Sequence, residues 1–384
     1  MLRIVSLNYE YPPIGGGGGN AHQHLLRALS EFDDIDLTLI APTLAPEGFT
    51  THEGERIRIH HLPLPNKQAR LYWRRGEIVR YLWQHDRFFA RHLREHRYDL
   101  CHVFFGFPTG VIAWRRCGSM PYAVSVRGSD VPGYNPRFTL DHALLRPLMS
   151  RIYRQASAVV ANSQGLRSLF ESQFPGLQAS VIPNGVDIQR FRPLNDEDRQ
   201  WNALATVARL IPRKGIDRLL QACGRLHEWN RDFQCHIVGE GPEREALEQQ
   251  ARALGIADRI HFHGDRPREW VAQALPAHGL FVLPSLAEGM PNAALEAMAC
   301  GLPLVLSDTG GSAELVDGNG CIVPVGDADA LAYALHDALR DSNRLRQWAR
   351  RSRERALNFS WRRVAEDYRT LYDQIANPER RPVL

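Results

Sequence analysis

Short runs of β-branched and other apolar residues alternate along the whole chain with amphipathic stretches long enough to form helices. Parallel strands need such a crossover between them, so the pattern predicts an α/β fold throughout. The strands predicted in the first half are 3–8, 37–41, 57–62, 100–104, 122–126 and 158–161. Those predicted in the second half are 203–207, 235–238, 260–262, 280–284, 304–307 and 321–323. Each half therefore carries enough strands for its own sheet.

A turn at 182–185 and a polar stretch at 191–198 mark the join between the halves. We predict one domain over 1–187 and a second over 188–359, in keeping with roughly 100 to 200 residues per domain for a chain of 384 residues. Up to Arg190 the chain has 22 basic and 16 acidic residues, and after it 25 and 27. The positive first half is expected to face a phosphate-rich surface or substrate.

Composition excludes several classes of protein. With 44% hydrophobic residues the chain can bury a large core, yet no apolar run approaches the roughly 18 residues of a membrane span. The first residues read as a strand and lack the features of a signal peptide, so a cytoplasmic location is expected. Six scattered cysteines without a Cys-x-x-Cys pair indicate reduced core residues and neither a zinc nor a redox site.

A run of five glycines, 15–19, follows the first predicted strand and precedes an amphipathic helix. Glycine lets the backbone approach a ligand closely, and a helix N-terminus favours an anion. The run is therefore a candidate phosphate site, with a flexible loop as the simpler alternative. It is a poor dinucleotide motif, because the last glycine of Gly-x-Gly-x-x-Gly, counted from Gly15, falls on Asn20.

Two cations, Arg209 and Lys214, lie five residues apart in a loop between a strand and a helix predicted from Ile216. Such a pair can converge on one diphosphate and stabilise it as a leaving group. Alone the pair is weak support, since cations near turns are usually solvated.

The most informative stretch is 283–303, where Glu288 falls in a loop and Glu296 in a short helix that ends before Gly301. Carboxylates at these places suit recognition of sugar hydroxyls better than a glycosidase acid/base pair, whose separation sequence spacing cannot fix. The backbone N–H groups of 290–293 are expected to point at a bound anion. A surface position is the alternative for Glu296, although its neighbours are largely apolar.

The spacing from Glu288 to Glu296 resembles the E-x7-E signature of the family-4 retaining glycosyltransferases, which have the GT-B fold of two Rossmann-like domains facing across a cleft. The resemblance extends, in the same order, to the following segments: 15–19, 184–187, Arg209 with Lys214, 238–242 and 309–316. Together they cover nearly the whole chain. They are specific for the family and silent on the sugar.

The resemblance implies roles for single residues. Glu296 would hold the donor ribose and Glu288 the donor sugar, while Arg209 and Lys214 grip the diphosphate. The remaining implied donor contacts are Gly16, Gly17, Gly289, Met290, Pro291 and Asn292, with Asp265 and Arg266 as possible neighbours of the base. It also implies no metal, no cofactor besides the nucleotide-sugar substrate, and a C-terminal helix, 360–376, that completes the first domain.

One position departs from the family pattern. Many members place a histidine near the bond that breaks, whereas the matching residue here is Arg127. Arginine stays protonated and cannot act as a general base, so Arg127 would hold the donor sugar or its phosphate. His102 is another polar group at a strand end, and it is equally well explained as a buried structural histidine.

The stretch 66–97 is rich in arginine and in aromatic residues. A basic helix with aromatic side chains can lie on an anionic membrane or meet a lipid-linked acceptor. The alternative is that the aromatics pack in the core and the arginines form a solvated face. Nucleic acid is a poorer partner, because no binding module accompanies the patch.

The leading functional hypothesis is transfer of a hexose from a nucleotide diphosphate donor to a saccharide or lipid-linked acceptor, as in polysaccharide or glycolipid assembly. The enzyme is expected in the cytoplasm, and any peripheral membrane contact would be with the inner face of the cell membrane. A nucleotide-sugar epimerase of the same architecture and a non-catalytic nucleotide-sugar binder are the alternatives. The binder is disfavoured because the chain has the residues that serve the leaving group, namely Glu288, Glu296, Arg209 and Lys214.

Overall fold

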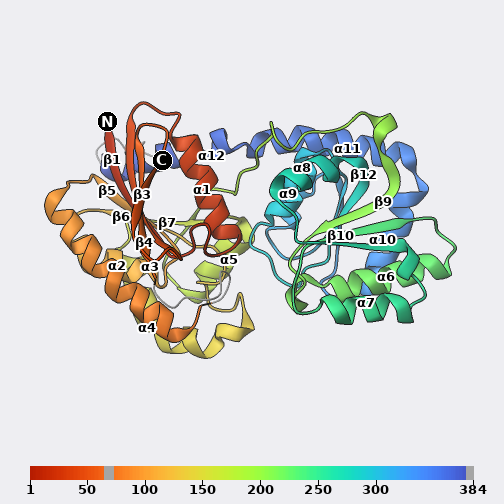
Figure 1. Cartoon of the computed structure of the whole chain (residues 1–384), viewed down its shortest axis with the longest axis horizontal. Coiled ribbons are helices and arrows are strands. Elements are labelled where there is room, and N and C mark those ends of the chain that lie inside the picture. Colours follow the sequence, from red (N-terminus) through yellow and green to blue (C-terminus); the bar gives the residue numbers. More distant parts are fainter. Residues whose placement is uncertain (65–72, 378–384) are drawn as a thin grey trace. The chain divides into compact units, whose positions relative to one another are not determined.

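The computed structural model describes residues 1–64 and 73–377 of the chain. These residues form two compact units. Unit 1 comprises the described residues of Met1–Gly185 and of Trp361–Leu384, and unit 2 is Val186–Ser360. Figure 1 shows that each unit consists of a sheet with helices packed around it.

The sheet of unit 1 has eight strands in the order β3-β4-β2-β1-β5-β6-β7-β8. Neighbouring strands are parallel except β3, which runs antiparallel to β4. The chain moves from β1 outward to β2 and later returns to the other side of β1 with β5. The strands are β1 Leu2–Asn8, β2 Ile35–Thr43, β3 Phe49–Glu53, β4 Ile57–Pro63, β5 Leu100–Phe104, β6 Tyr122–Ser125, β7 Ala158–Ala161 and β8 Ser180–Val181.

Six α-helices are described in unit 1: α1 Gly17–Leu29, α2 Arg75–Glu95, α3 Thr109–Arg116, α4 Thr139–Gln155, α5 Gln164–Gln173 and α12 Trp361–Ala376. The last of these comes from the far end of the chain and packs against α1 and β5. Its buried residues recur at helical spacing, namely Val364, Ala365, Tyr368, Tyr372 and Ile375. These residues lie along one side of the helix, which is the side that it buries.

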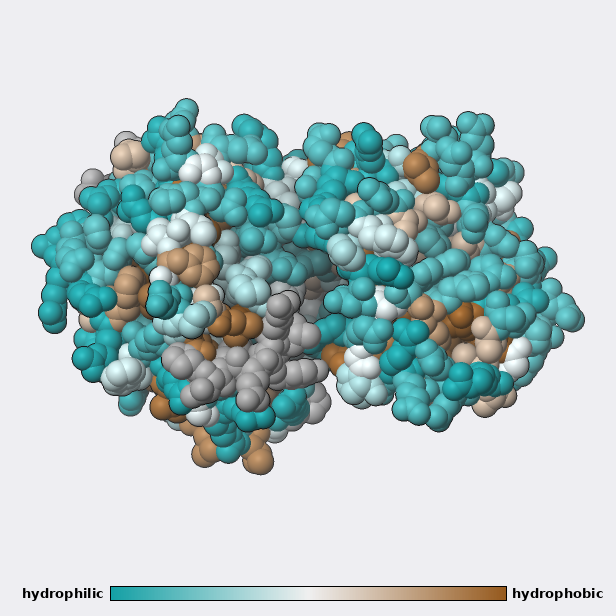
Figure 2. All heavy atoms as spheres, in the orientation of Figure 1, coloured by the Kyte–Doolittle hydropathy of each residue, from teal (hydrophilic) through white to brown (hydrophobic). Residues whose placement is uncertain are grey.

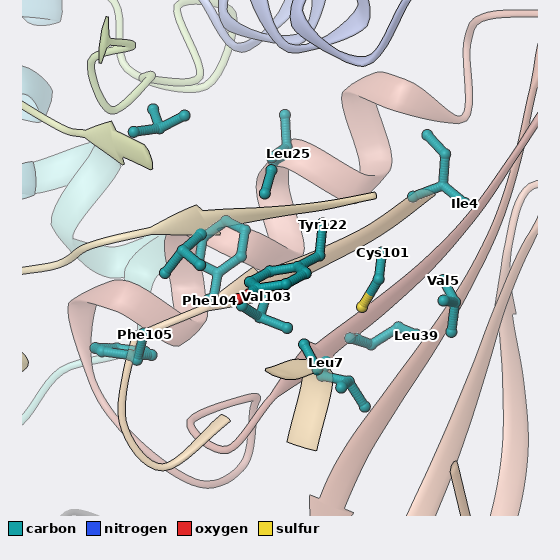
Figure 3. Close-up of a cluster of buried hydrophobic side chains, with 14 of the residues drawn as sticks. Ile4, Val5, Leu7, Leu25, Leu39, Cys101, Val103, Phe104, Phe105 and Tyr122 are labelled. Atoms are coloured by element: carbon teal, nitrogen blue, oxygen red, sulfur yellow. The ribbon is translucent and has the colours of Figure 1, made fainter. Parts of the chain in front are cut away.

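The core of unit 1 lies between the central strands and the helices beside them. Figure 3 shows side chains from β1, β2, β5 and β6 converging with Leu25 of α1. Ile4, Leu39 and Val103 are among those that are fully buried. Strands that are buried on both faces, such as β5, are typical of a parallel sheet covered by helices.

Unit 2 has a six-stranded parallel sheet in the order β11-β10-β9-β12-β13-β14. The strands are β9 Gln200–Val207, β10 Gln234–Val238, β11 Ile260–Gly264, β12 His278–Leu283, β13 Leu304–Ser307 and β14 Gly320–Val323. The α-helices are α6 Ile216–Glu228, α7 Arg244–Ala253, α8 Arg268–Ala274, α9 Asn292–Ala299, α10 Ala328–Arg340 and α11 Ser342–Ala356.

All twelve strands predicted from the sequence are present, and the predicted α/β class is confirmed. The sequence missed β3 and β8. β3 is largely exposed and β8 has only two residues, so neither carries the apolar run of a buried strand. No helix within the described ranges is long and apolar enough to cross a membrane.

Candidate functional site

The order of strands locates a site in unit 2. From β9 the chain first builds β10 and β11 on one side and then returns to build β12, β13 and β14 on the other. The carboxyl ends of β9 and β12 therefore flank a topological switch point, where open α/β sheets bind ligands. Lys214 lies in the loop after β9, and Glu288 lies in the loop after β12.

Backbone contacts join these two loops. The N–H of Leu286 donates to the carbonyl oxygen of Arg213 at 2.8 Å. Gly215 adopts a left-handed conformation with φ of 64°, and a Cβ there would overlap the carbonyl oxygen of Pro284. Glycine is needed at this point on both counts. The loop after β9 is thus held against the loop after β12, although 74 residues separate Lys214 from Glu288.

Lys214 and Glu288 form an ion pair in this place. Their side chains are 15% and 8% exposed, and the hydroxyl of Ser285 donates to the same carboxylate oxygen at 2.7 Å. Burial alone would raise the pKa of Glu288, but the Lys214 ammonium and the Ser285 hydroxyl hold that pKa below its ordinary value. Glu288 is therefore an ionised carboxylate over the whole physiological pH range.

Glu296 has a cation of its own. Arg268, the first residue of α8, donates from Nη2 to Oε1 of Glu296 at 2.6 Å. Glu296 is 12% exposed, so it is not a solvated surface residue. Burial raises its pKa, and the Arg268 guanidinium opposes that rise. A buried carboxylate on a rigid helix, with one oxygen already bonded, can accept hydrogen bonds from a ligand hydroxyl with little further ordering.

Further predicted residues of unit 2 come from the loops after β9 and β12 and from the start of α9. Arg209 follows β9 and is half-buried, and within the described residues its guanidinium forms no ion pair. Pro291 is the N-cap of α9 and provides no side-chain cap for it. Gly289 and Met290 belong to the loop before α9, and Asn292 is the first residue of α9. The same loop pairs with the 309–316 segment through a bridge between Glu288 and Gly310.

Asp265 and Arg266, the predicted neighbours of a base, are exposed directly after β11. Nε of Arg266 donates to the carbonyl oxygen of His263 at 2.9 Å, and its guanidinium lies 5.3 Å from the ring centroid of Trp270. β11 is the edge strand of the sheet. The same loop leads two residues later to Arg268, which bonds Glu296. The loop after β11 is thus tied to α9.

The glycine run in unit 1 divides into residues with different constraints. Gly15 has φ of 93° and lies against Glu10, and a Cβ at Gly19 would overlap the carbonyl oxygen of Glu10. These two glycines are required by the fold. A Cβ at Gly16, by contrast, would meet nothing within 4 Å. Gly16 is the N-cap of α1, whose first residue is Gly17, so this helix starts at an open surface.

Arg127 follows β6 and is held in place by neutral partners. Nη1 donates to Oδ1 of Asn184 at 2.8 Å, and Nη2 donates to the hydroxyl of Tyr368 on α12 at 3.0 Å. The guanidinium carbon lies 4.3 Å from the ring centroid of Phe104. Asp130 accepts from the backbone N–H of Arg127 rather than from its guanidinium. No carboxylate in the described part of the chain pairs with this guanidinium.

His102 is a structural histidine. It is fully buried, with Nδ1 2.8 Å from the Tyr372 hydroxyl and Nε2 2.8 Å from the Ser125 hydroxyl. Burial and the nearby charge of Arg127 lower its pKa to about 3, so the ring is neutral. Both ring nitrogens are satisfied within the core, which leaves none for a substrate.

Comparison with known proteins identifies the family. Residues 16–185 match the glycosyl transferase 4-like domain, and residues 187–355 match the glycosyl transferases group 1. The chain belongs to the group 1 glycosyltransferases. The family resemblance seen in the sequence is therefore confirmed. The GT-B fold class is confirmed as well.

One named relative supports the family, and two solved structures share the fold. The GDP-mannose-dependent alpha-(1-6)-phosphatidylinositol monomannoside mannosyltransferase of Mycolicibacterium smegmatis is 33% identical over 272 residues, which is 65% of this chain and 69% of that protein. Sucrose-phosphate synthase from Thermosynechococcus elongatus shares the fold with a TM-score of 0.83 and 22% identity, over 97% of this chain and 99% of that chain. Anabaena Alr3699/HepE in complex with UDP has a TM-score of 0.71 and 20% identity, and the match covers 97% of this chain and 100% of that chain.

Sequence reasoning missed three partners of the predicted residues. Ser285 lies only three residues before Glu288, so a local signal was present. Arg268 lies 28 residues from Glu296, and Tyr368 lies 241 residues from Arg127. These two contacts depend on tertiary packing, and no local pattern could have revealed them.

Proposed function

We propose that this glycosyltransferase transfers a hexose from a nucleotide diphosphate donor to a saccharide or lipid-linked acceptor with retention of anomeric configuration and without a metal ion. The observation that carries the proposal is the arrangement at the switch point of unit 2. There Glu288 and Lys214 form a buried ion pair, Arg209 lies in the same loop after β9 as Lys214, and Glu296 is bonded by Arg268. The segments after β9, β11 and β12 thus supply both cations and carboxylates, as a nucleotide sugar requires.

Each group has a distinct proposed task. Lys214 and Arg209 bind the diphosphate and stabilise the charge that builds on it as the sugar departs. Glu296 accepts hydrogen bonds from the ribose hydroxyls, and Glu288 accepts them from the sugar. The connection 289–292 offers backbone N–H groups to the same donor.

Retention follows from a scheme in which the departing diphosphate oxygen removes the acceptor proton on the same face of the sugar. Such a scheme needs positioning and electrostatic stabilisation rather than a separate base. Arg127 fits it, because arginine cannot accept a proton, and His102 is enclosed in the core. The parts assigned to Gly16, Gly17 and Arg127 of unit 1 stay predictions. Metal independence is supported by the two cations, which supply the charge that a metal would.

The kind of reaction in the chain's relatives favours this proposal over its alternatives. The mycobacterial relative is named as a mannosyltransferase that uses GDP-mannose, and a structural neighbour was solved with UDP-glucose. An epimerase would convert the donor without any acceptor, and a pure binder would never release the nucleoside diphosphate. Neither alternative is favoured by the family. GDP-mannose and UDP-glucose are therefore the first donors to test.

A donor-binding assay on two variants tests the site. Glu296→Ala removes the acceptor for ribose hydroxyls, so the affinity for nucleoside diphosphates should fall by about tenfold or more, in line with the cost of one or two lost charged hydrogen bonds. Glu288→Ala should chiefly lower kcat. The measurements are calorimetric titration with GDP and UDP, and nucleotide release with EDTA present.

A matched control is Glu228→Ala, which removes an exposed carboxylate at the C-terminal end of α6, away from the loops that hold Glu288 and Glu296. Equal nucleotide affinity in Glu296→Ala and wild type would refute the ribose role. Loss of all activity in EDTA, restored by a divalent cation, would refute metal independence. Inversion of the anomeric centre, seen by NMR of the product, would refute retention.

A further inference from the structure

Helix α2 of unit 1 exposes two large apolar side chains that its own packing does not need. Val79 is 66% exposed and Trp83 is 62% exposed, although Tyr81, His85 and Phe89 on the other side of the helix are fully buried. Positions 75, 79, 83 and 87 are spaced four apart, so they lie along one face of the helix. The residues at the two ends of that row are Arg75 and Arg87, and both are exposed.

A second helix adds apolar residues beside the first. On α4, Leu140 is 78% exposed and Leu144 is 81% exposed, again four residues apart. The start of α4 contacts the start of α2, because Nη2 of Arg75 donates to Oδ1 of Asp141 at 2.8 Å. Asp141 lies between the two leucines in sequence. The first turns of the two helices are therefore in contact, and each helix carries its exposed row beyond that contact.

We call these residues the basic-apolar face. It comprises Arg75, Val79, Arg80, Trp83, Arg87, Leu140 and Leu144. Figure 2 shows hydrophobic side chains on the surface of unit 1 along the edge where α4 runs in Figure 1. The predicted patch began at residue 66, and its residues 66–72, which include Lys67, Arg70 and Tyr72, lie outside the described residues.

The face is positively charged. Two of the acids on these helices are compensated by cations, since Asp86 pairs with Arg116 and Asp141 with Arg75. The guanidinium of Arg87 lies 4.8 Å from the ring centroid of Trp83, so the cation and the aromatic ring are presented together. Arg87 and Arg80 thus lie on the same helix as the exposed Val79 and Trp83.

Another helix shows that arginine content alone does not define such a face. Helix α11 of unit 2 has arginines that bond within the unit: Arg344 to Asp337, Arg346 to Asp196, Arg355 to Asp317, and Arg353 to backbone carbonyl groups. Those side chains hold neighbouring segments together. The basic-apolar face differs because it combines cations with four exposed apolar residues.

We propose that the basic-apolar face docks unit 1 on an anionic lipid bilayer. Trp83, Leu140 and Leu144 enter the boundary between headgroups and acyl chains, and the arginines bind lipid phosphates. A helix that lies in the interface combines apolar burial with attraction to anionic lipids, and both halves of that combination are present here. Docking through this face does not depend on the donor chemistry in unit 2.

Co-sedimentation of the full chain with vesicles tests the proposal. Wild type should bind phosphatidylcholine vesicles that contain phosphatidylglycerol and should bind pure phosphatidylcholine at least about tenfold more weakly, because each cation near the surface contributes to binding. Arg80→Glu/Arg87→Glu should lower the partition coefficient by about a hundredfold. Leu140→Ser/Leu144→Ser should lower it by about tenfold without changing net charge.

The control is Arg340→Glu/Arg350→Glu, which makes the same charge change on exposed positions of unit 2. It should bind like wild type, and thermal unfolding should show that all variants are folded. An equal loss in this control would reduce the effect to net charge and overturn the proposal. Binding to neutral and anionic vesicles alike would overturn it too. A third result would also overturn the proposal: the protein binds soluble heparin but not vesicles, and the serine variant binds heparin as wild type does. That result would assign the face to a soluble polyanion.

Discussion

The two units hold the charges of their candidate residues in different ways. In unit 2, Glu288 and Glu296 each face a cation, Lys214 and Arg268, and all four side chains are largely buried. In unit 1, the guanidinium of Arg127 is bonded by an amide oxygen and a phenol hydroxyl, both neutral. A buried ion pair needs both members, whereas an arginine held by neutral groups keeps its full charge for a ligand.

The largest expected effect comes from breaking the Lys214 pair. Lys214→Met leaves Glu288 buried without its cation, which should lower the free energy of unfolding by about 3 kcal/mol, since removal of one partner leaves an uncompensated charge. The same change removes a cation from the diphosphate, and kcat/KM should fall by about a hundredfold or more. Denaturant unfolding and a nucleotide-release assay measure the two effects.

The second pair provides a matched comparison within unit 2. Arg268→Gln leaves Glu296 without its guanidinium in the same manner, but it should weaken nucleoside diphosphate binding more than it changes kcat. If Lys214→Met and Arg268→Gln gave the same ratio of lost affinity to lost turnover, the division of tasks between Glu288 and Glu296 would be wrong.

A smaller effect is expected in unit 1. Tyr368→Phe removes the hydroxyl that accepts from Arg127 and that lies 3.0 Å from the Ser125 hydroxyl. Because the ring still packs and no buried charge loses a counter-ion, the free energy of unfolding should fall by only about 1 kcal/mol. If Arg127 contacts the donor, KM for the donor should rise a few-fold through its loosened guanidinium. Urea unfolding and steady-state kinetics test both statements.

The control for that substitution is Tyr333→Phe, at a largely exposed position of unit 2. A loss of stability in Tyr368→Phe as large as that in Lys214→Met would remove the difference drawn between the units. An unchanged KM alongside lowered stability would leave Tyr368 a purely structural residue and would count against a donor role for Arg127.

An effect that is small at neutral pH and grows in acid concerns four histidine rings on the sheet of unit 2. His236 Nδ1 lies 3.0 Å from His263 Nε2, and the His236 ring lies 4.7 Å from the rings of His261 and His278, centroid to centroid. Burial, followed by the charges of the neighbouring histidines, lowers the pKa of His236 to about 4. In the unfolded chain a histidine titrates near its ordinary value of about 6.5.

The unfolded chain therefore binds more protons than the folded one between about pH 6.5 and 4, so the free energy of unfolding should fall as the pH falls through that window. His236→Gln should make the fall shallower, as followed by thermal unfolding between pH 7 and 5. The exposed His227→Gln serves as control. A pH dependence that His236→Gln leaves unchanged would assign the acid sensitivity to other groups.

The sequence predicted several residues of the site but not their hydrogen-bond and ion-pair partners. The loop position of Glu288 and the helical position of Glu296 followed from Pro291 and Gly301, and the structure agrees with both. Ser285 was within reach of local reasoning, being three residues from Glu288. Arg268 was not, because nothing near Glu296 in the sequence shows which residue of α8 will face it.

Periodicity and turn residues determined the elements of this protein, since strand and helix patterns depend on neighbours two to four residues apart. Motif residues in their order determined the family. Only the tertiary structure decided that Lys214 would bond Glu288, that α12 would place Tyr368 on Arg127, and that Trp83 and two leucines of α4 would remain outside. Such contacts join residues far apart in the chain, and they exist only once the strands of each sheet have taken their order.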